Sequence, residues 1–88
     1  MGLNTYGILY PPYLALTLAV NPSGINSIPR SVRAGTVDEV NYANIKINVG
    51  TTCLFKNDDA IIVTAGGTDY YIIDEDNLIF KAVTQFLP

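Results

Sequence analysis

Few side chains in this sequence could carry out catalysis or bind a metal. The acidic residues gather in two groups, Asp58-Asp59 and Asp74-Glu75-Asp76, and both groups lie among turn-forming residues. The second group lacks the D-x-D-x-D-G spacing and the distant glutamate of a calcium loop. Neither group has neighbours in the sequence that would shift a carboxyl pKa, as paired catalytic carboxylates require. Both groups are therefore expected to be solvated turns.

The only other reactive candidates are a cysteine and a glycine-rich turn. Cys53 is the single cysteine, and the sequence contains no histidine, which removes the commonest general base and zinc ligand. With no basic cluster beside it, the Cys53 thiol should stay protonated and buried. Gly66-Gly67-Thr68-Asp69 lacks the lysine of a phosphate loop, and a hairpin turn explains it. The sequence predicts a protein that is not an enzyme and uses no cofactor or metal.

The composition points to contacts with other protein subunits. Apolar residues make up 49% of the 88 residues, and charged residues make up 15%, against a usual charged share of about 25%. A single small domain cannot bury so many apolar side chains, so part of them is expected to face a partner. The five basic residues are scattered along a chain with a net charge of −3, which argues against nucleic-acid binding.

The elements that must position these residues are strands. Short apolar runs occur at 13–20, 32–40, 45–49, 52–55, 60–65, 70–73 and 78–83. Turn-forming clusters separate the runs, and the pattern predicts an all-β fold, a small antiparallel β-barrel. Hairpins are expected across Lys56–Asp59 and Gly66-Gly67, and a bend or bulge at Gly35. Asp74–Asn77 is expected to form at most one helical turn.

Residues 1–12 are predicted to form an extended arm, and residues 13–88 the β-barrel domain. Pro11-Pro12 excludes a helix, and the segment is too apolar for a solvated tail. Its apolar side chains, together with the first tyrosine of the barrel, are expected to bind a neighbouring subunit: Leu3, Tyr6, Ile8, Leu9, Tyr10 and Tyr13. The run at 7–20 has no basic leading region and is broken by the prolines, so neither a signal peptide nor a membrane span is expected.

Two further pairs of apolar residues are candidates for partner binding. Ile25 and Ile28 stand in an otherwise polar loop, where they either pack back onto the barrel or bind a partner. Phe86 and Leu87 form an apolar end to the sequence. Tyrosine and other large apolar side chains supply much of the contact area at protein interfaces.

Several short motifs follow one another in a distinctive order. Val49–Phe55 reads V-G-T-T-C-L-F, and Tyr70–Ile79 reads Y-Y-I-I-D-E-D-N-L-I. These resemble the V-G-D-x-V-L-F strand and the E-Y-L-I-L-x-E-x-D-I-L closing segment of GroES-type co-chaperonins. Gly35-Thr36-Val37 and Ser23-Gly24-Ile25 occupy the places of that family's G-x-V and G-G-I. The resemblance covers about residues 13–83 and implies a GroES-like β-barrel that assembles into rings through its terminal strands.

The sequence departs from the co-chaperonin pattern at two places, and both correspond to functional parts of that family. The mobile loop of co-chaperonins carries three consecutive apolar residues, whereas the corresponding positions here are Ile25-Asn26-Ser27. Two polar residues there would forfeit roughly 1.5–3 kcal/mol of burial for each apolar side chain lost. The seven residues at 38–44 leave no room for the family's roof hairpin.

Two functional hypotheses follow. The first is a non-enzymatic structural assembly protein, a bacteriophage-type virion component such as a capsid cement (decoration) or neck protein, which would form homo-oligomers or bind capsid or neck subunits. Its location would be the virion, with no membrane or nucleic-acid partner. The alternative is a cytoplasmic co-chaperonin that caps a chaperonin ring. This alternative predicts a free heptamer and an Ile25–Pro29 loop that becomes ordered on the chaperonin.

Overall fold

The computed structural model describes residues 3–10, 12–21, 25–40 and 47–82. They form six strands and three short 3-10 segments. The strands are β1 (Tyr13–Leu18), β2 (Val32–Val40), β3 (Thr52–Lys56), β4 (Ile61–Ala65), β5 (Thr68–Asp74) and β6 (Leu78–Ala82). The 3-10 segments are η1 (Leu3–Thr5), η2 (Asn57–Asp59) and η3 (Glu75–Asn77). The described residues contain no α-helix, and none of their helical segments is long and apolar enough to span a membrane.

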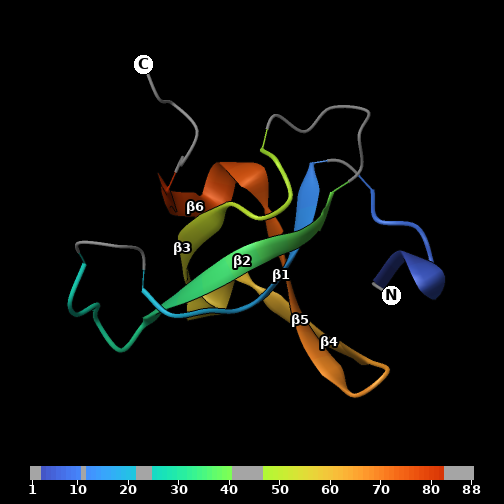
Figure 1. Ribbon diagram of the computed structural model, residues 1–88, viewed down its shortest axis with the longest axis horizontal. Helices are drawn as coiled ribbons and strands as arrows, with labels where there is room; N and C mark the ends of the chain where they lie inside the picture. Colours follow the sequence, from blue (N-terminus) through green and yellow to red (C-terminus); the bar gives the residue numbers. More distant parts are fainter. Residues whose placement is uncertain (1–2, 11, 22–24, 41–46, 83–88) are drawn as a thin grey trace.

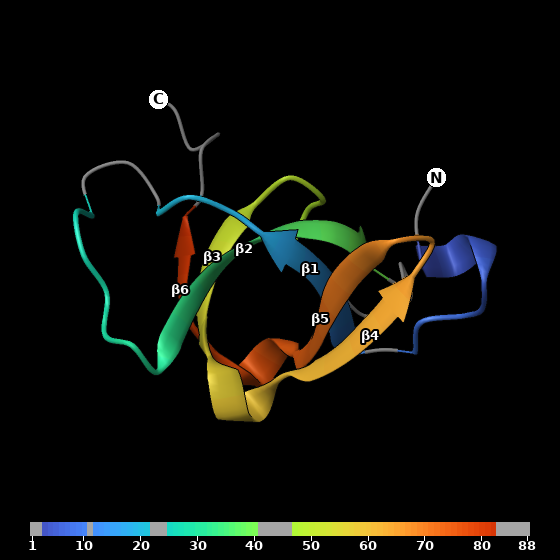
Figure 2. The same cartoon turned by 90° about the horizontal axis from the view of Figure 1, so that it is seen from below.

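The six strands form one antiparallel sheet in the order β4-β5-β1-β2-β3-β6. The sheet curls strongly, so that its strands curve around a common interior (Figures 1 and 2). The all-β antiparallel fold predicted from the sequence is therefore confirmed. Within the described residues no ladder joins the edge strands β4 and β6, so closure of the barrel is not confirmed.

The main hydrophobic core fills the interior of this curled sheet. Its buried residues come from four strands and one connection: Leu14, Leu16, Val37, Val40, Ile47, Cys53, Phe55, Tyr71 and Ile73. Leu14 and Leu16 alternate along β1 and are fully buried, as the apolar spacing predicted. The rings of Phe55 and Tyr71 lie with their centroids 5.7 Å apart, tilted by 47°. Each such side chain contributes about 1.5–3 kcal/mol by its burial.

Gly35 lies where two core side chains approach the backbone of β2. A Cβ atom at this position would lie 3.0 Å from Leu16 Cβ and 3.0 Å from Phe55 Cε1. A bend or a bulge was expected at Gly35, and the register between β1 and β2 places the bulge further along the strand. Leu16 pairs with Val37 and Ala15 pairs with Glu39, so the extra residue is between them. Glycine is required at position 35 because Leu16 and Phe55 leave no room for a side chain there.

Two predicted strand features are wrong. Lys56–Asp59 does not close a hairpin, because β3 pairs with β2 and β6 while β4 pairs with β5. The described part of the predicted strand 45–49 forms a bend and a turn instead. There the Gly50 N–H donates to the carbonyl of Val37 at 2.8 Å, and Ile47 enters the core. The turn therefore anchors to β2 through one hydrogen bond and one buried side chain.

Two turns agree with their predictions. Gly66 and Gly67 connect β4 to β5 with φ angles of 60° and 83°, which is the backbone of a type I′ hairpin turn. The single helical turn expected at Asp74–Asn77 is η3. Its first free N–H, on Asp76, donates to the Asp74 carboxylate at 2.9 Å.

Candidate functional site

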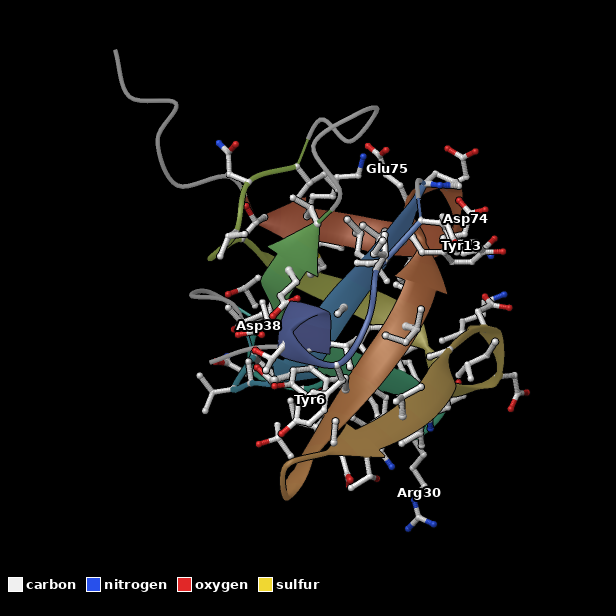
Figure 3. All side chains as sticks on the ribbon, turned by 90° about the vertical axis from the view of Figure 1, so that its right-hand side faces the viewer. Tyr6, Tyr13, Arg30, Asp38, Asp74 and Glu75 are labelled. Atoms are coloured by element: carbon white, nitrogen blue, oxygen red, sulfur yellow. The ribbon has the colours of Figure 1, made fainter. Side chains whose placement is uncertain are left out.

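The N-terminal arm lies on the outer face of the sheet. Tyr70 and Ile72 alternate along β5 with the core residues Tyr71 and Ile73, so they project from the opposite face. Leu9 is buried against this face in a second cluster with Ala15 and Tyr70. The arm therefore covers apolar surface that the curled interior cannot take in (Figure 3).

Backbone hydrogen bonds shape the arm at its start and join its end to another element. The Tyr6 N–H donates to the Leu3 carbonyl at 2.9 Å and closes the η1 turn. At the other end, the Tyr13 N–H donates to Tyr10 at 2.9 Å, and the Glu75 N–H donates to the Pro12 carbonyl at 3.1 Å. The hydrogen bond between Glu75 and Pro12 fixes the start of β1 beside η3.

A groove of about 320 Å³ separates the arm from the β4–β5 hairpin. Its lining residues are apolar, aromatic or glycine: Leu3, Tyr6, Gly7, Ile8, Leu9, Val63 and Ile72. We call it the arm–hairpin groove. The Tyr6 hydroxyl oxygen lies 2.6 Å from the place where a Cβ on Gly66 would be, so Tyr6 reaches the tip of the hairpin. Such a groove can hold an apolar side chain, and the Tyr6 phenol is the one titratable group among its described lining residues.

Large apolar side chains stand exposed on both sides of the groove. We call them the arm–hairpin surface: Tyr6, Ile8 and Tyr10 on the arm, and Ile61 and Val63 on β4. Ile8 is 75% exposed and Ile61 is 65% exposed, although both are purely apolar. Ile62, also exposed, projects from the other face of β4. None of these side chains is charged.

The structure brings together only some of the residues predicted to bind a partner. Leu3, Tyr6, Ile8 and Leu9 all line the arm–hairpin groove, where Leu9 is buried against the protein's own sheet. Tyr10 is exposed on the same arm, and Tyr13 is exposed at the start of β1.

The other predicted residues lie elsewhere. Ile25 and Ile28 are half-buried in the connection between β1 and β2. The described part of this connection before β2 lies on the opposite side of the molecule from the arm (Figure 1). Phe86 and Leu87 lie outside the described residues. The arm and the 25–29 loop therefore do not form one surface.

The exposed residues of β4 were not predicted as binding residues. The sequence indicated a strand at 60–65 but not that this strand would lie at an edge of the sheet. One signal was available, because Ile61-Ile62-Val63 is apolar on both faces of the strand rather than alternating. A strand that is apolar on both faces is typical of positions covered on both sides.

Burial disfavours the ionised forms of two side chains, Cys53 and Tyr70. Burial raises the pKa of the Cys53 thiol to about 11, and the nearby charge of Lys81 only partly opposes this effect. Burial, followed by the negative charges of Asp38 and Glu39, also raises the pKa of the Tyr70 phenol. In the described part of the chain no group of three or more His, Cys, Asp or Glu side chains could hold a metal ion.

No protein-family model matches this sequence, and no curated protein is similar to it. The resemblance to co-chaperonins therefore stays a prediction from the motifs.

Proposed function

We propose that the protein is a non-enzymatic subunit of a larger protein assembly and that the arm–hairpin surface binds a neighbouring subunit. The observation that carries this proposal is the concentration of exposed apolar side chains around one groove. Large exposed apolar patches are uncommon on monomeric proteins, and exposed apolar side chains gathered around a groove are typical of sites of protein contact.

The energetics of the surface support a protein partner. Covering one Ile or Val side chain completely is worth about 1.5–3 kcal/mol, and several such residues lie together here. Ile8 and Ile61 retain most of their apolar surface for such a contact. The absence of charge on the arm–hairpin surface keeps the cost of desolvation low. Tyr6 and Tyr10 belong to a residue type that is enriched at interface cores.

The chemistry of the groove favours binding over catalysis. Its described lining offers one phenol, on Tyr6, and otherwise only apolar side chains and glycine. The thiol of Cys53 is fully buried in the main core, away from this groove. A neighbouring subunit that inserts an apolar side chain therefore fits the groove better than a polar substrate does.

For the kind of assembly we propose the one predicted from the sequence, a virion. A virion component, such as a capsid cement or neck protein, would use a low-charge barrel-like domain with an apolar arm in this way. A co-chaperonin would instead use the 25–29 loop, in which Ile25 and Ile28 are half-buried. The apolar side chains of the arm–hairpin surface are more exposed than Ile25 and Ile28, so we place the principal contact there.

The proposal is tested by replacing Ile8, the most exposed apolar residue of the arm–hairpin surface. Ile8→Asp should convert the assembled protein to smaller species while circular dichroism stays unchanged, because a buried unpaired charge is strongly unfavourable. Size-exclusion chromatography with light scattering measures the mass. Val20→Asp is the matched control, since Val20 is 85% exposed beyond the end of β1. A monomeric wild-type protein, or equal effects of the two substitutions, would contradict the proposal.

A further inference from the structure

The edge strand β4 lacks the features that usually keep sheet edges from pairing. Natural edge strands carry lysine, proline or bulges, which prevent another strand from adding to them. Ile61–Ala65 reads I-I-V-T-A, with no charge and no proline, and its ladder with β5 has no irregularity. The other edge strand, β6, contains Lys81, which pairs with Glu75 at 3.9 Å. The described residues provide no second partner for β4.

The hairpin turn determines which backbone groups of β4 face the open edge. A type I′ turn at Gly66-Gly67 makes Ala65 and Thr68 a hydrogen-bonded pair. Hydrogen-bonded and non-hydrogen-bonded pairs alternate along an antiparallel ladder. Val63 therefore bonds to β5, whereas the N–H and C=O groups of Ile62 and Thr64 point outward. These outward groups form a template for one more strand.

We propose that β4 pairs with β4 of a second copy of this chain, antiparallel and about a twofold axis that passes beside Val63. This inference rests on the proposed function, and it names the partner and the geometry of the contact. In this register Val63 faces Val63 of the second copy as a non-hydrogen-bonded pair. Ile62 and Thr64 of opposite copies then exchange the hydrogen bonds that both strands leave open.

The side chains of β4 are complementary to themselves in this register. Ile61 faces Ala65, and Ile62 faces Thr64, so each large residue lies opposite a smaller one. A shift of the register in either direction would leave fewer residues of the strand paired. The acidic residues Asp58 and Asp59 also lie outside the paired strand, because they belong to η2, before β4 begins. Like charges opposite each other in a ladder would be destabilising.

The twofold pairing also connects the two arm–hairpin surfaces. Ile61 and Val63 lie on the same face of the hairpin as Ile72 and Tyr70, their partners in β5. A twofold axis perpendicular to the sheet keeps these faces on one side. The two grooves then lie beside each other on a continuous sheet of twelve strands, twice the six of one copy. The same interface therefore covers the open edge of β4 and places the two arms on one face of the sheet.

Cysteine cross-linking tests this register directly. Facing residues in a non-hydrogen-bonded pair have Cα atoms about 4.5 Å apart, which lies within the range that a disulfide bridges. Val63→Cys should therefore form a disulfide-linked dimer under mild oxidation, seen by mass spectrometry without reductant. Ile79→Cys on β6 is the matched control, because Ile79 is also half-exposed on an edge strand. Native Cys53 is fully buried and should stay reduced in both variants.

A second substitution tests the contact without oxidation. Val63→Lys would place two ammonium groups opposite each other, and we expect it to weaken dimerisation at least tenfold in sedimentation equilibrium. Val20→Lys should leave dimerisation unchanged. Assembly that persists in Val63→Lys, without cross-linking of Val63→Cys, would overturn the β4 pairing and leave the proposed function standing. A wild-type chain that is monomeric at every concentration would overturn both.

Discussion

At Gly35 the packing of single atoms decides whether a substitution is tolerated. Adding one methyl group would bring a Cβ to 3.0 Å from atoms of Leu16 and Phe55, both fully buried. We expect Gly35→Ala to lower the free energy of unfolding by about 1–3 kcal/mol, the usual cost of overpacking a core. Urea denaturation measures the change. Gly7→Ala is the control, because a Cβ there meets no atom within 4 Å, and an equal loss in both variants would contradict this account.

The buried thiol of Cys53 gives a prediction about pH. Its pKa is about 11 in the folded protein, above the ordinary value of 9.0, because burial disfavours the thiolate. Between about pH 9 and about pH 11 the unfolded chain loses this proton first, so the free energy of unfolding should fall as the pH rises. Below pH 9 this contribution is fully present.

The contribution of Cys53 is measured by comparison with Cys53→Val. Tyr70 also has a raised pKa, so the wild-type protein contains more than one alkaline-sensitive group. The variant removes only the thiol, and its unfolding free energy should fall less steeply between pH 9 and 11 in denaturation experiments. Identical slopes for the two proteins would show that the thiol does not titrate differently on folding.

At the scale of elements, the arm depends on one buried side chain. Leu9 packs against Ala15 and Tyr70, whereas its neighbour Ile8 is exposed. Leu9→Asp should detach the arm from the sheet and cost about 1.5–3 kcal/mol in lost burial, with the curled core intact. Limited proteolysis should then cleave the arm faster than in Thr5→Asp, in which an exposed residue is replaced. Equal cleavage in the two variants would contradict the packing of the arm.

The sequence predicted most strands because their signals are local. Turn residues such as Gly66-Gly67 and the apolar alternation of Leu14 and Leu16 mark the ends and faces of strands directly. The pairing of strands was less predictable. Lys56–Asp59 has the composition of a hairpin, yet β3 pairs with β6, which is distant in sequence. Which strands pair depends on the whole core, and no short segment contains that information.

The same limit applies to the candidate site. The arm was predicted to be a binding element because Pro12 and the apolar side chains before it exclude both a helix and a solvated tail. The part played by Ile61 and Val63 was not predicted, because a strand becomes an edge only through the topology of the sheet. The part of the site on β4 could therefore be found only from the structure.

At the scale of the whole molecule, composition and shape lead to the same conclusion. An 88-residue chain with 49% apolar residues fills one curled core and still leaves large apolar side chains exposed. Among the described residues they are densest on the arm and on β4. An assembly that covers this surface would supply stability that a core of this size cannot provide alone.

The most direct test of this account is the native mass spectrum of the unmodified protein. The chain has a mass of 9.5 kDa. Twofold pairing through β4, together with contacts at the arm–hairpin surface, predicts species at even multiples of this mass that dissociate on dilution. A single species at the mass of one chain, unchanged as the protein concentration rises, would contradict the central claim that this surface joins subunits.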